Sequence, residues 1–497
     1  MEAAILEVIR RRLTRFSLPL ISLDGVYNCE NWQLSGFECK TDTPGNTFCR
    51  GPVFLPGTFL IESVLDHVAH QVGREAEEVK SMNLYKKGDV SLAGQTLADS
   101  NARATFDLCV SNADFGDRAK EVEDFNAKNT LVKRGLAICP SKVRTDEGRM
   151  GTAPIQKSDI LLPPPHQYMM NPCTGFPSLV SVQEDASVLI QHTGCEIGQG
   201  LNTKAVQTAA LELGVACDAI KCAATSSRIA KTGNVTGGST TSEAICASTV
   251  LACQEIARRM APVKQANPDA KWADLVSKCY SQGIDLAARA VYDGSQRQPG
   301  VLPDQQDNGP SPYVQYGCAA VEVQVDVLTG ETQVLRVDLV QDNGISLNTA
   351  VDVGQIQGSF IMGLGYMLTE EFVWDRTGKR TGSAGSNVSN GTWEYKPMSS
   401  LDIPIEFNVT LLPKSVNSHG VLGSKSVGEP PLILSAGVVS AVRKAVQAFR
   451  RQQGGGKEKE FCAISAPATV EKVQLATGLN LQDLPLVARS ESRALCI

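Results

Sequence analysis

Four glycine-containing polar turns each lead directly into a helical pattern, and this recurrence constrains the fold more than any other feature. The turns and the helices predicted after them lie at 194–200 and 201–213, 237–242 and 243–260, 353–355 and 356–368, and 428–429 and 430–449. A helix N-terminus presents unpaired amide donors and the positive end of the helix dipole, which suits an anion. The recurrence therefore predicts a large polyanionic ligand held by amides. The sequence leaves open whether the turns meet in space or are ordinary strand-to-helix turns.

The turns also carry polar side chains that could contact such a ligand. Gln199 and Gln355 each place an amide at the mouth of a predicted helix. Ser239, Thr241 and Ser242 add hydroxyl groups, which serve as hydrogen-bond donors and as helix caps.

The fourth turn differs because it carries a carboxylate. Glu429 stands immediately before Pro430, a residue that suits the first position of a helix. The run that follows, 432–439, is too apolar for a solvated surface helix, so we expect Glu429 at the edge of a buried space. Burial raises the pKa of a carboxyl group, which is useful for a general base. From this local pattern Glu429 is either such a base or a carboxylate that caps the helix.

Strand and helix patterns alternate irregularly along the chain. Apolar residues at every second position of 321–327, a Thr329-Gly330 turn and a return strand through Leu335, Val337 and Leu339 predict a β-hairpin. A helix is predicted over 59–72 from four apolar residues at helical spacing, namely Leu60, Val64, Val68 and Val72. The proline run at 163–165 predicts a surface insertion over about 156–175. Because few strand–helix–strand repeats occur, we expect an α+β fold with mixed sheets and packed helices.

Composition excludes several classes of function. The net charge of −6 provides no basic surface for nucleic acid, and no run of eighteen apolar residues predicts a membrane span. Fifteen cysteines, an odd number without any CxxC pair, indicate free thiols in a reducing compartment, and we expect a cytoplasmic protein. The same pattern argues against an iron–sulfur or zinc site in this chain. Arginines at 10–12 and 15 leave a transit peptide as the alternative.

Four motifs stand in order along the chain: Gly194-Cys195-Glu196-Ile197-Gly198-Gln199-Gly200-Leu201-Asn202-Thr203-Lys204, Thr236-Gly237-Gly238-Ser239, Asp352-Val353-Gly354-Gln355 and Ser424-Lys425-Ser426-Val427-Gly428-Glu429-Pro430-Pro431. They resemble, in the same order, motifs of the xanthine dehydrogenase and aldehyde oxidase family of molybdenum hydroxylases. The segments 39–47 and 316–330 also fit, and the resemblance runs from about 26 to about 472.

The resemblance implies a molybdenum–molybdopterin cofactor and assigns roles to individual residues. Glu429 matches the general base, and Arg50 matches a residue whose backbone approaches the metal. No side chain is implied to ligate the metal directly. The remaining cofactor contacts implied by the resemblance are Ile197, Gly198, Gln199, Gly238, Ser239, Thr241, Ser242 and Gln355.

Two positions in the implied substrate pocket depart from the xanthine-type pattern. Pro52 looks more like the aldehyde oxidase sequence, and Leu18 stands where xanthine-type enzymes carry a substrate arginine, if no gap intervenes. An apolar residue cannot pair with a purine oxygen. We therefore expect oxidation of aldehydes, or of uncharged N-heterocycles, with oxygen derived from water. Purine hydroxylation of the xanthine dehydrogenase type is the alternative.

The resemblance covers only the C-terminal portion of the family's complete chain. It implies the end of a first molybdopterin-binding domain at 1–90, a linker at 91–130 and a second such domain at 131–497. The 2Fe-2S and FAD groups are expected only on upstream domains, and a homodimer is expected in the complete enzyme. Because those domains are not in this chain, a truncated non-catalytic remnant is a further alternative.

Overall fold

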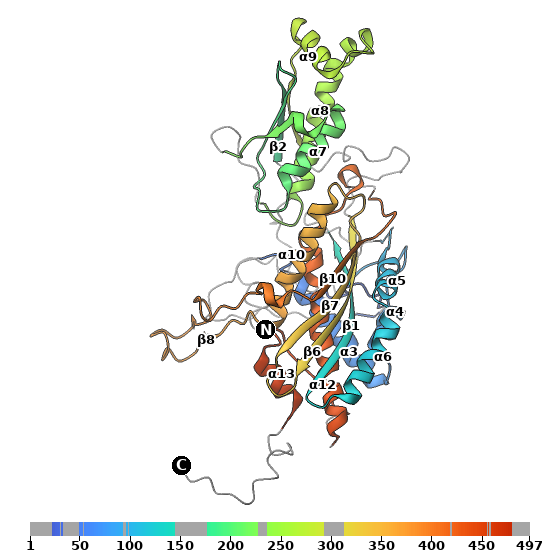
Figure 1. The fold of residues 1–497 in the computed structure, drawn as a ribbon, viewed down its shortest axis with the longest axis vertical. Helices are drawn as coiled ribbons and strands as arrows, with labels where there is room; N and C mark the ends of the chain where they lie inside the picture. The colour runs from blue at the N-terminus through green and yellow to red at the C-terminus, as the bar shows by residue number, and fades with distance from the viewer. Residues whose placement is uncertain are drawn as a thin grey trace, which may run out of the picture.

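The computed structural model describes residues 22–29, 31–32, 49–52, 54–92, 96–97, 99–144, 176–226, 236–292, 313–417, 420–454, 456 and 459–479. These residues form two parts, one above the other in Figure 1. We call the described residues of 176–292 the lobe, and those of 22–144 and 313–479 the body. Leu18, the motif at 39–47 and the insertion expected at 156–175 lie outside the described residues.

The body is built around a four-stranded mixed sheet with the order β1-β6-β7-β10. β1 (Val132–Arg144), β6 (Val314–Asp326) and β7 (Thr332–Gln341) pair antiparallel. β10 (Glu406–Leu411) runs parallel to β7, because the chain between them crosses over through α10 (Thr349–Leu368). That connection also forms an arm, labelled β8 in Figure 1, with the short strands β8 (Trp374–Asp375) and β9 (Ser386–Asn387).

Helices cover both faces of the body sheet, which is therefore the middle of three layers. α12 (Ala436–Gln453) packs on β1 and β6 from one side, and α5 (Ala102–Asn112) and α6 (Phe115–Lys128) pack from the other. Successive β1 side chains point to opposite faces. Ala137 and Cys139 accordingly join the core under α12, and Leu136 and Ile138 join the core under α5 and α6. The other helices of the body are α3 (Phe54–Val72), α4 (Ala76–Met82), α11 (Pro430–Ile433) and α13 (Val470–Thr477).

The predicted hairpin is present as β6 and β7. Its four valines at 321, 323, 325 and 327 are fully buried, as the alternation predicts. The return strand differs at one point, because a bulge between Glu322 and Val323 shifts the register. Val337 and Leu339 face the core as expected, but Val334 is buried in place of Leu335.

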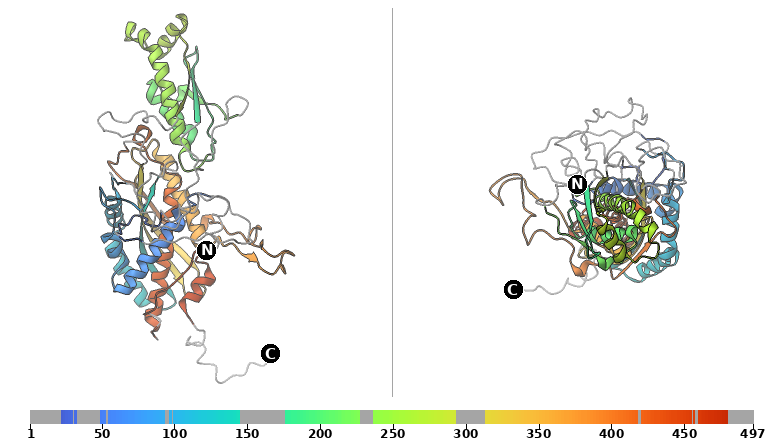
Figure 2. Two further views of the ribbon diagram at one scale, coloured as in Figure 1. Left: turned by 180° about the vertical axis from the view of Figure 1, so that it is seen from behind. Right: turned by 90° about the horizontal axis from the view of Figure 1, so that it is seen from above.

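The lobe has a second mixed sheet with the order β4-β3-β2-β5. Its strands are β2 (Phe176–Val182), β3 (Val188–His192), β4 (Ile220–Cys222) and β5 (Ala287–Tyr292). The helices α7 (Leu201–Leu213), α8 (Thr241–Ala266) and α9 (Trp272–Ser281) share one hydrophobic core with it. Figure 2 shows from behind that the lobe lies against the end of the body near α10. The mixed sheets and packed helices of both parts confirm the predicted α+β fold.

The segment 91–130, expected to be a linker, contains α5 and α6. Phe106 and Cys109 of α5 and Phe115 and Val122 of α6 are buried against the body sheet. The segment is polar on average, but its few apolar residues recur at helical spacing and cover one face of the sheet. The domain boundaries themselves stay a prediction.

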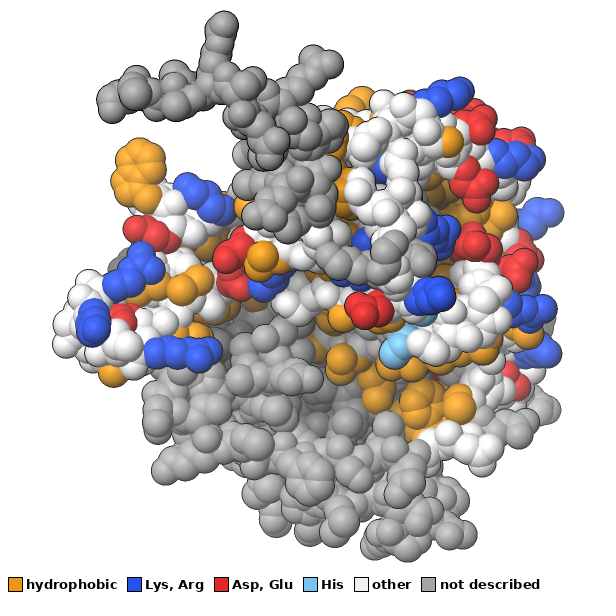
Figure 3. All heavy atoms as spheres, turned by 90° about the horizontal axis from the view of Figure 1, so that it is seen from below, with side chains coloured by type: hydrophobic (Ala, Val, Ile, Leu, Met, Phe, Trp, Pro, Cys, Tyr) orange, Lys and Arg blue, Asp and Glu red, His pale blue; other side chains and the backbone are white. Residues whose placement is uncertain are grey.

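The helix predicted at 59–72 is present as α3, but its buried face differs from the one that the apolar spacing indicates. The predicted face is solvent-exposed, with 43% of Leu60, 52% of Val64, 42% of Val68 and 58% of Val72 accessible. The inner face instead buries Glu62, whose carboxylate lies 2.8 Å from the Lys80 ammonium. Exposed hydrophobic side chains are visible on the underside of the molecule (Figure 3). A buried ion pair on the inner face is a feature that hydrophobic periodicity cannot detect.

The segment Pro430–Gln453, which includes α11 and α12, is long and apolar enough to cross a membrane by composition alone. In this fold 89% of its most apolar window is buried inside the protein, so it acts as a core helix. The cysteines also match expectation within the described residues, where all twelve are free and seven are buried.

A close approach between α12 and β1 provides a test of this packing. A Cβ added at Gly135 of β1 would lie 1.9 Å from the Ala441 carbonyl oxygen of α12. We expect Gly135→Ala to lower the free energy of unfolding by about 3 kcal/mol or more, because backbone must move to relieve the overlap. Gly116→Ala in α6, where an added Cβ meets nothing within 4 Å, is the matched control and should leave stability unchanged or slightly raised. Urea unfolding measures both, and similar midpoints for the two variants would contradict the packing.

Candidate cofactor site

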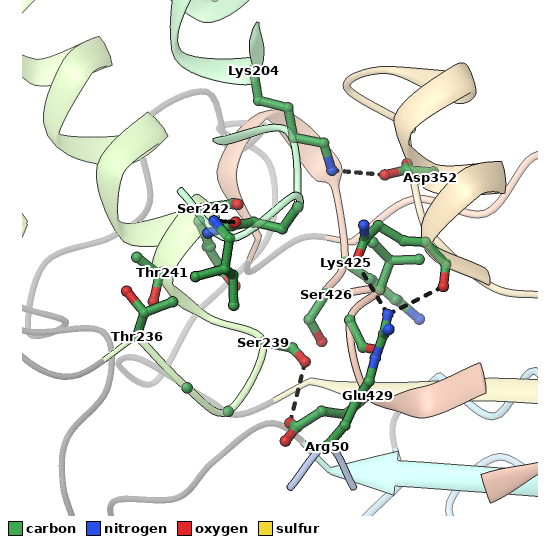
Figure 4. A pocket seen from close by; sticks show the side chains of 18 of the residues that line it. Arg50, Lys204, Thr236, Ser239, Thr241, Ser242, Asp352, Lys425, Ser426 and Glu429 are labelled. Atoms are coloured by element: carbon green, nitrogen blue, oxygen red, sulfur yellow. Dashed lines mark hydrogen bonds and ion pairs between the residues drawn. The ribbon is translucent and has the colours of Figure 1, made fainter. Parts of the chain in front are cut away.

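A cavity of about 410 Å³ lies where the lobe meets the body, and all four turns contribute to its wall (Figure 4). The lobe supplies side chains from the start of α7 and from the turn before α8, and the body supplies the start of α10 and the turn before α11. The lining residues are Cys49, Arg50, Ile197, Gln199, Lys204, Thr236, Gly237, Gly238, Ser239, Thr241, Ser242, Glu243, Leu347, Asp352, Gln355, Met362, Ser424, Lys425, Ser426, Val427, Gly428 and Glu429. The four turns, which are spread over more than 200 residues of the sequence, therefore converge.

The turn before α7 is held together by its own side chains. The Glu196 carboxylate accepts hydrogen bonds from the amides of Gly198, Gly200 and Asn202 at 3.0 to 3.1 Å. Gln199 accepts from the Ile197 amide at 2.6 Å and donates to the Cys195 carbonyl at 2.8 Å. Gln199 and Ile197 line the cavity, but Glu196 already occupies the anion-binding end of this helix.

The turn before α8 leads into one polar side chain, that of Thr241, without a hydrogen-bond partner among the described residues. The Thr241 side chain is 3% exposed, and its hydroxyl oxygen has no hydrogen-bond partner within the described protein. Gly238 and Ser239 both adopt left-handed backbone conformations, with φ of 64° and 60°. The 26-residue helix α8 begins at this turn, so its dipole has its positive end at the cavity. This turn is therefore the best anion-binding feature of the site.

The third turn was placed wrongly by the sequence analysis. α10 begins at Thr349, not at Ile356, and Asn348 caps it by accepting a hydrogen bond from the Val351 amide at 2.9 Å. Gln355 consequently lies in the second turn of the helix rather than at its mouth. Its side chain still reaches the cavity, where it donates to the Gly198 carbonyl oxygen at 3.0 Å and so joins the body to the lobe.

Glu429 lies at the point where the fourth turn enters α11, with Pro430 in the first turn of that helix as predicted. Its side chain makes no capping hydrogen bond to this helix. The carboxylate instead accepts from the Gly51 amide at 3.3 Å and from the Ser239 hydroxyl at 3.2 Å. Burial raises the pKa of Glu429, and these two donors together with Arg50 oppose the rise only in part. The capping interpretation therefore does not fit, and a partly buried carboxylate with raised pKa lines the cavity.

Arg50 joins two of the turns through its side chain. Its guanidinium donates to the Gly428 carbonyl at 2.5 Å and to the backbone and side-chain oxygens of Gln355 at 3.2 and 3.1 Å. The backbone of Arg50 is strained, with φ of 21°. Pro52 is half-buried close by but does not line the cavity.

Besides Asp352, three charged residues of the cavity wall were given no role in the sequence analysis. The Lys204 ammonium lies 2.7 Å from Asp352, and the Lys425 ammonium lies 2.6 Å from Asp342. Glu243 is the third, and burial raises its pKa to about 7. Lys204 and Lys425 stand within the quoted motifs, and Glu243 lies four residues after Ser239, so helical spacing from known site residues was the available signal.

The donor set fits a molybdopterin-type group. Backbone amides, the unpartnered Thr241 hydroxyl and the positive end of α8 suit phosphate and pterin oxygens. The two lysines are neutralised by aspartates, so the cavity binds through amides more than through net positive charge. Among the described residues, no cluster of three or more His, Cys, Asp or Glu side chains could hold a metal ion.

Comparisons with known proteins agree with this chemistry. The molybdopterin cofactor-binding domain models match residues 15–84 and 108–404. Xanthine dehydrogenase/oxidase from Gallus gallus is 35% identical over 459 residues, which are 92% of this chain and 31% of that protein. Aldehyde oxidase 4 from Cavia porcellus is 33% identical over 458 residues, 92% of this chain and 32% of that protein. The chain thus spans about a third of the length of these relatives.

Solved structures show the same fold. Quinoline 2-oxidoreductase from Pseudomonas putida 86 has a TM-score of 0.72 at 20% identity, covering 94% of this chain and 57% of that chain. The aldehyde oxidoreductase from Desulfovibrio desulfuricans has a TM-score of 0.65 at 20% identity, covering 93% of this chain and 45% of that chain. Xanthine- and aldehyde-oxidising relatives match about equally well, so the comparisons do not separate these two specificities.

The Arg50 side chain should contribute to stability because it fills three acceptors in a partly buried setting. We expect Arg50→Lys to lower the free energy of unfolding by about 1–3 kcal/mol, since one ammonium cannot replace the planar fork of donors. Arg103→Lys is the control, because Arg103 also donates to three oxygens, of Ser81 and Asp107, but on the surface. Arg103→Lys should lower the free energy of unfolding by no more than about 0.5 kcal/mol. Equal losses in urea unfolding would show that Arg50 does not join the turns.

Proposed function

The chain belongs to the molybdopterin-binding family of xanthine dehydrogenases and aldehyde oxidases, and we propose that it forms the part of a molybdenum hydroxylase that oxidises aldehydes, with Glu429 as general base. Uncharged N-heterocycles belong to the same proposed substrate class. The observation that carries the proposal is the Glu429 carboxyl group, which lines the cavity at the junction of the four turns with its pKa raised by burial.

The molybdenum group, when bound, would supply the electron-accepting centre for this oxidation. Oxidation of an aldehyde consumes one water and yields a carboxylic acid, two protons and two electrons. Glu429 accepts one proton, at either carboxylate oxygen, from the water that provides the new oxygen atom. Its neutral donors, Gly51 and Ser239, orient the carboxylate without removing its basicity as a direct ion pair would.

The residues of the lobe and body would hold the cofactor from two sides. The Thr241 hydroxyl and the amides at the start of α8 are suited to its phosphate, and Gln199 and Gln355 are suited to its pterin. The electrons would leave through iron–sulfur and flavin groups on other parts of the complete enzyme. Pro52 and Leu18 favour an aldehyde over a purine, because neither side chain can bind a purine oxygen.

Co-expression with the iron–sulfur and flavin domains of a relative tests the proposal directly. We expect purified protein to contain molybdenum and to oxidise an aromatic aldehyde with an artificial electron acceptor, faster than it oxidises xanthine. Metal analysis and product detection measure both. Faster turnover of xanthine would favour the purine hydroxylase, and absence of molybdenum from folded protein would favour the non-catalytic remnant.

Substitution of Glu429 tests the role of the base. We expect Glu429→Gln to lower kcat about 10²- to 10⁴-fold while the molybdenum content stays unchanged, because the amide keeps the shape but accepts no proton. In the unsubstituted enzyme, kcat should fall as pH decreases through the raised pKa of Glu429, since protonation removes the base.

Glu370→Gln is the matched control for Glu429→Gln. Burial also raises the pKa of Glu370, which accepts a hydrogen bond from Tyr395 outside the cavity. Its substitution should leave kcat and the pH profile unchanged. A Glu429→Gln enzyme that keeps full turnover would refute the assignment of the base.

A further inference from the structure

The turn that carries Glu429 is connected at two separate points to the start of α8 and to the turn that precedes it. One is the Ser239 hydroxyl, which donates to the Glu429 carboxylate at 3.2 Å. The other passes through a tyrosine: the Ser426 amide donates to the Tyr313 hydroxyl at 2.8 Å, and that hydroxyl donates to the Glu243 carboxylate at 2.9 Å. We propose that Glu243 and Tyr313 are positioning residues that fix the backbone of the Glu429 turn by holding the Ser426 amide.

Tyr313 is well placed to hold a backbone group. It is buried and immediately precedes β6, which is paired with β1 on one side and β7 on the other. Lys425 reinforces the same contact, because its ammonium donates to the Val314 carbonyl at 2.9 Å. The Tyr313 ring is thus anchored to the central strand of the body, and its hydroxyl provides a fixed acceptor for Ser426.

Glu243 sets the direction of the Tyr313 hydroxyl. A hydroxyl can rotate, so its lone pairs point at the Ser426 amide only if its proton has an acceptor elsewhere. The Glu243 carboxylate is that acceptor, and it comes from the first turn of α8 in the lobe. The hydrogen-bonded chain therefore crosses from lobe to body and makes the backbone at Ser426 depend on the position of α8.

Two residues separate Ser426 from Glu429, and this short segment is held at its other end as well. The Gly428 carbonyl accepts from the Ser359 hydroxyl at 3.0 Å and from the Arg50 guanidinium at 2.5 Å. Val427 between them is buried in the body core. Both ends of this segment are therefore fixed by hydrogen bonds. Loss of the hydrogen bond to the Ser426 amide should change the backbone conformation that sets the position of the Glu429 carboxylate.

We call the hydrogen-bonded link from Glu243 through Tyr313 to the Ser426 amide the clamp. Hydrogen exchange in the cofactor-free 497-residue chain tests it without any activity measurement. We expect Tyr313→Phe to speed exchange of the peptide containing Ser426 about fivefold, the effect of losing one buried hydrogen bond. Tyr280→Phe is the control, because its hydroxyl donates to the Val182 carbonyl at 2.8 Å within the lobe. It should leave the Ser426 peptide unchanged. Unchanged exchange in Tyr313→Phe, or an equal rise in peptides of α12, would overturn the proposal.

Two variants of Glu243 distinguish the effect of its oxygen as a hydrogen-bond acceptor from the effect of its negative charge. Glu243→Gln keeps an oxygen acceptor and should preserve the slow exchange of the Ser426 peptide, whereas Glu243→Ala should raise it about as much as Tyr313→Phe. Glu212→Ala is the control, since Glu212 is a partly buried carboxylate of α7 that accepts from Gln254 in the lobe. The assigned role of Glu243 is wrong if the Ser426 peptide exchanges at the same rate in Glu243→Ala as in the unsubstituted chain. It is also wrong if that peptide exchanges as fast in Glu243→Gln as in Glu243→Ala.

The inference rests on the proposed role of Glu429 only for its consequence in catalysis. In the molybdenum-loaded enzyme, Tyr313→Phe should lower kcat severalfold and leave KM unchanged, because the base is displaced while substrate binding is not. Failure of the exchange test would refute the clamp but would not affect the proposal that Glu429 is the base. Full turnover by Glu429→Gln would refute the proposed base but would not affect the clamp.

Discussion

The packing of α12 against the body sheet determines where the Glu429 carboxylate lies. Gly135 lets the backbone of α12 approach β1 closely, at the Ala441 carbonyl, and the residues of α11 that precede α12 are completely buried. Glu429 is the residue from which α11 starts, so the depth of these helices in the core sets the depth of the carboxylate. A solvent-exposed helix would place the same residue in water and leave its pKa near the usual value. The apolar sequence after Pro430 is therefore a requirement of the site as well as of the fold.

The cavity is polar without being strongly charged. Each lysine on its wall is paired with an aspartate, and Glu196 occupies the amides at the start of α7. What is left for a ligand is the start of α8, with its helix dipole and the Thr241 hydroxyl. Recognition by fixed amides selects the shape of a ligand more than its charge. This suits a large cofactor that must be held in one orientation between two parts of the chain.

Much of the site could be predicted from the sequence, but for unequal reasons. Three of the four predicted glycine turns and the proline after Glu429 are local signals that the sequence interpretation placed correctly. That the turns meet is a property of the tertiary fold, and only the resemblance to a known family indicated it. The start of α10 was misplaced because the glycines near Gln355 look like a turn, whereas Asn348, an ordinary capping residue seven positions earlier, begins the helix. The buried face of α3 was predicted wrongly for another reason: Glu62 on its inner face pairs with Lys80 of α4, and its outer face carries Leu60 and the valines.

The partners of Glu429 could not have been found by any local pattern, since Gly51 and Ser239 lie 378 and 190 residues away. Their hydrogen bonds lower the pKa of the carboxyl group, but they offset only part of the rise that burial causes. An amide and a hydroxyl orient it but carry no charge, and the Arg50 guanidinium donates to Gly428 and Gln355 rather than closing on the carboxylate. A direct ion pair in the same buried place would stabilise the ionised form and lower the pKa below the range useful for accepting a proton. The arginine thus holds the turn together while the carboxylate keeps the raised pKa that burial gives it.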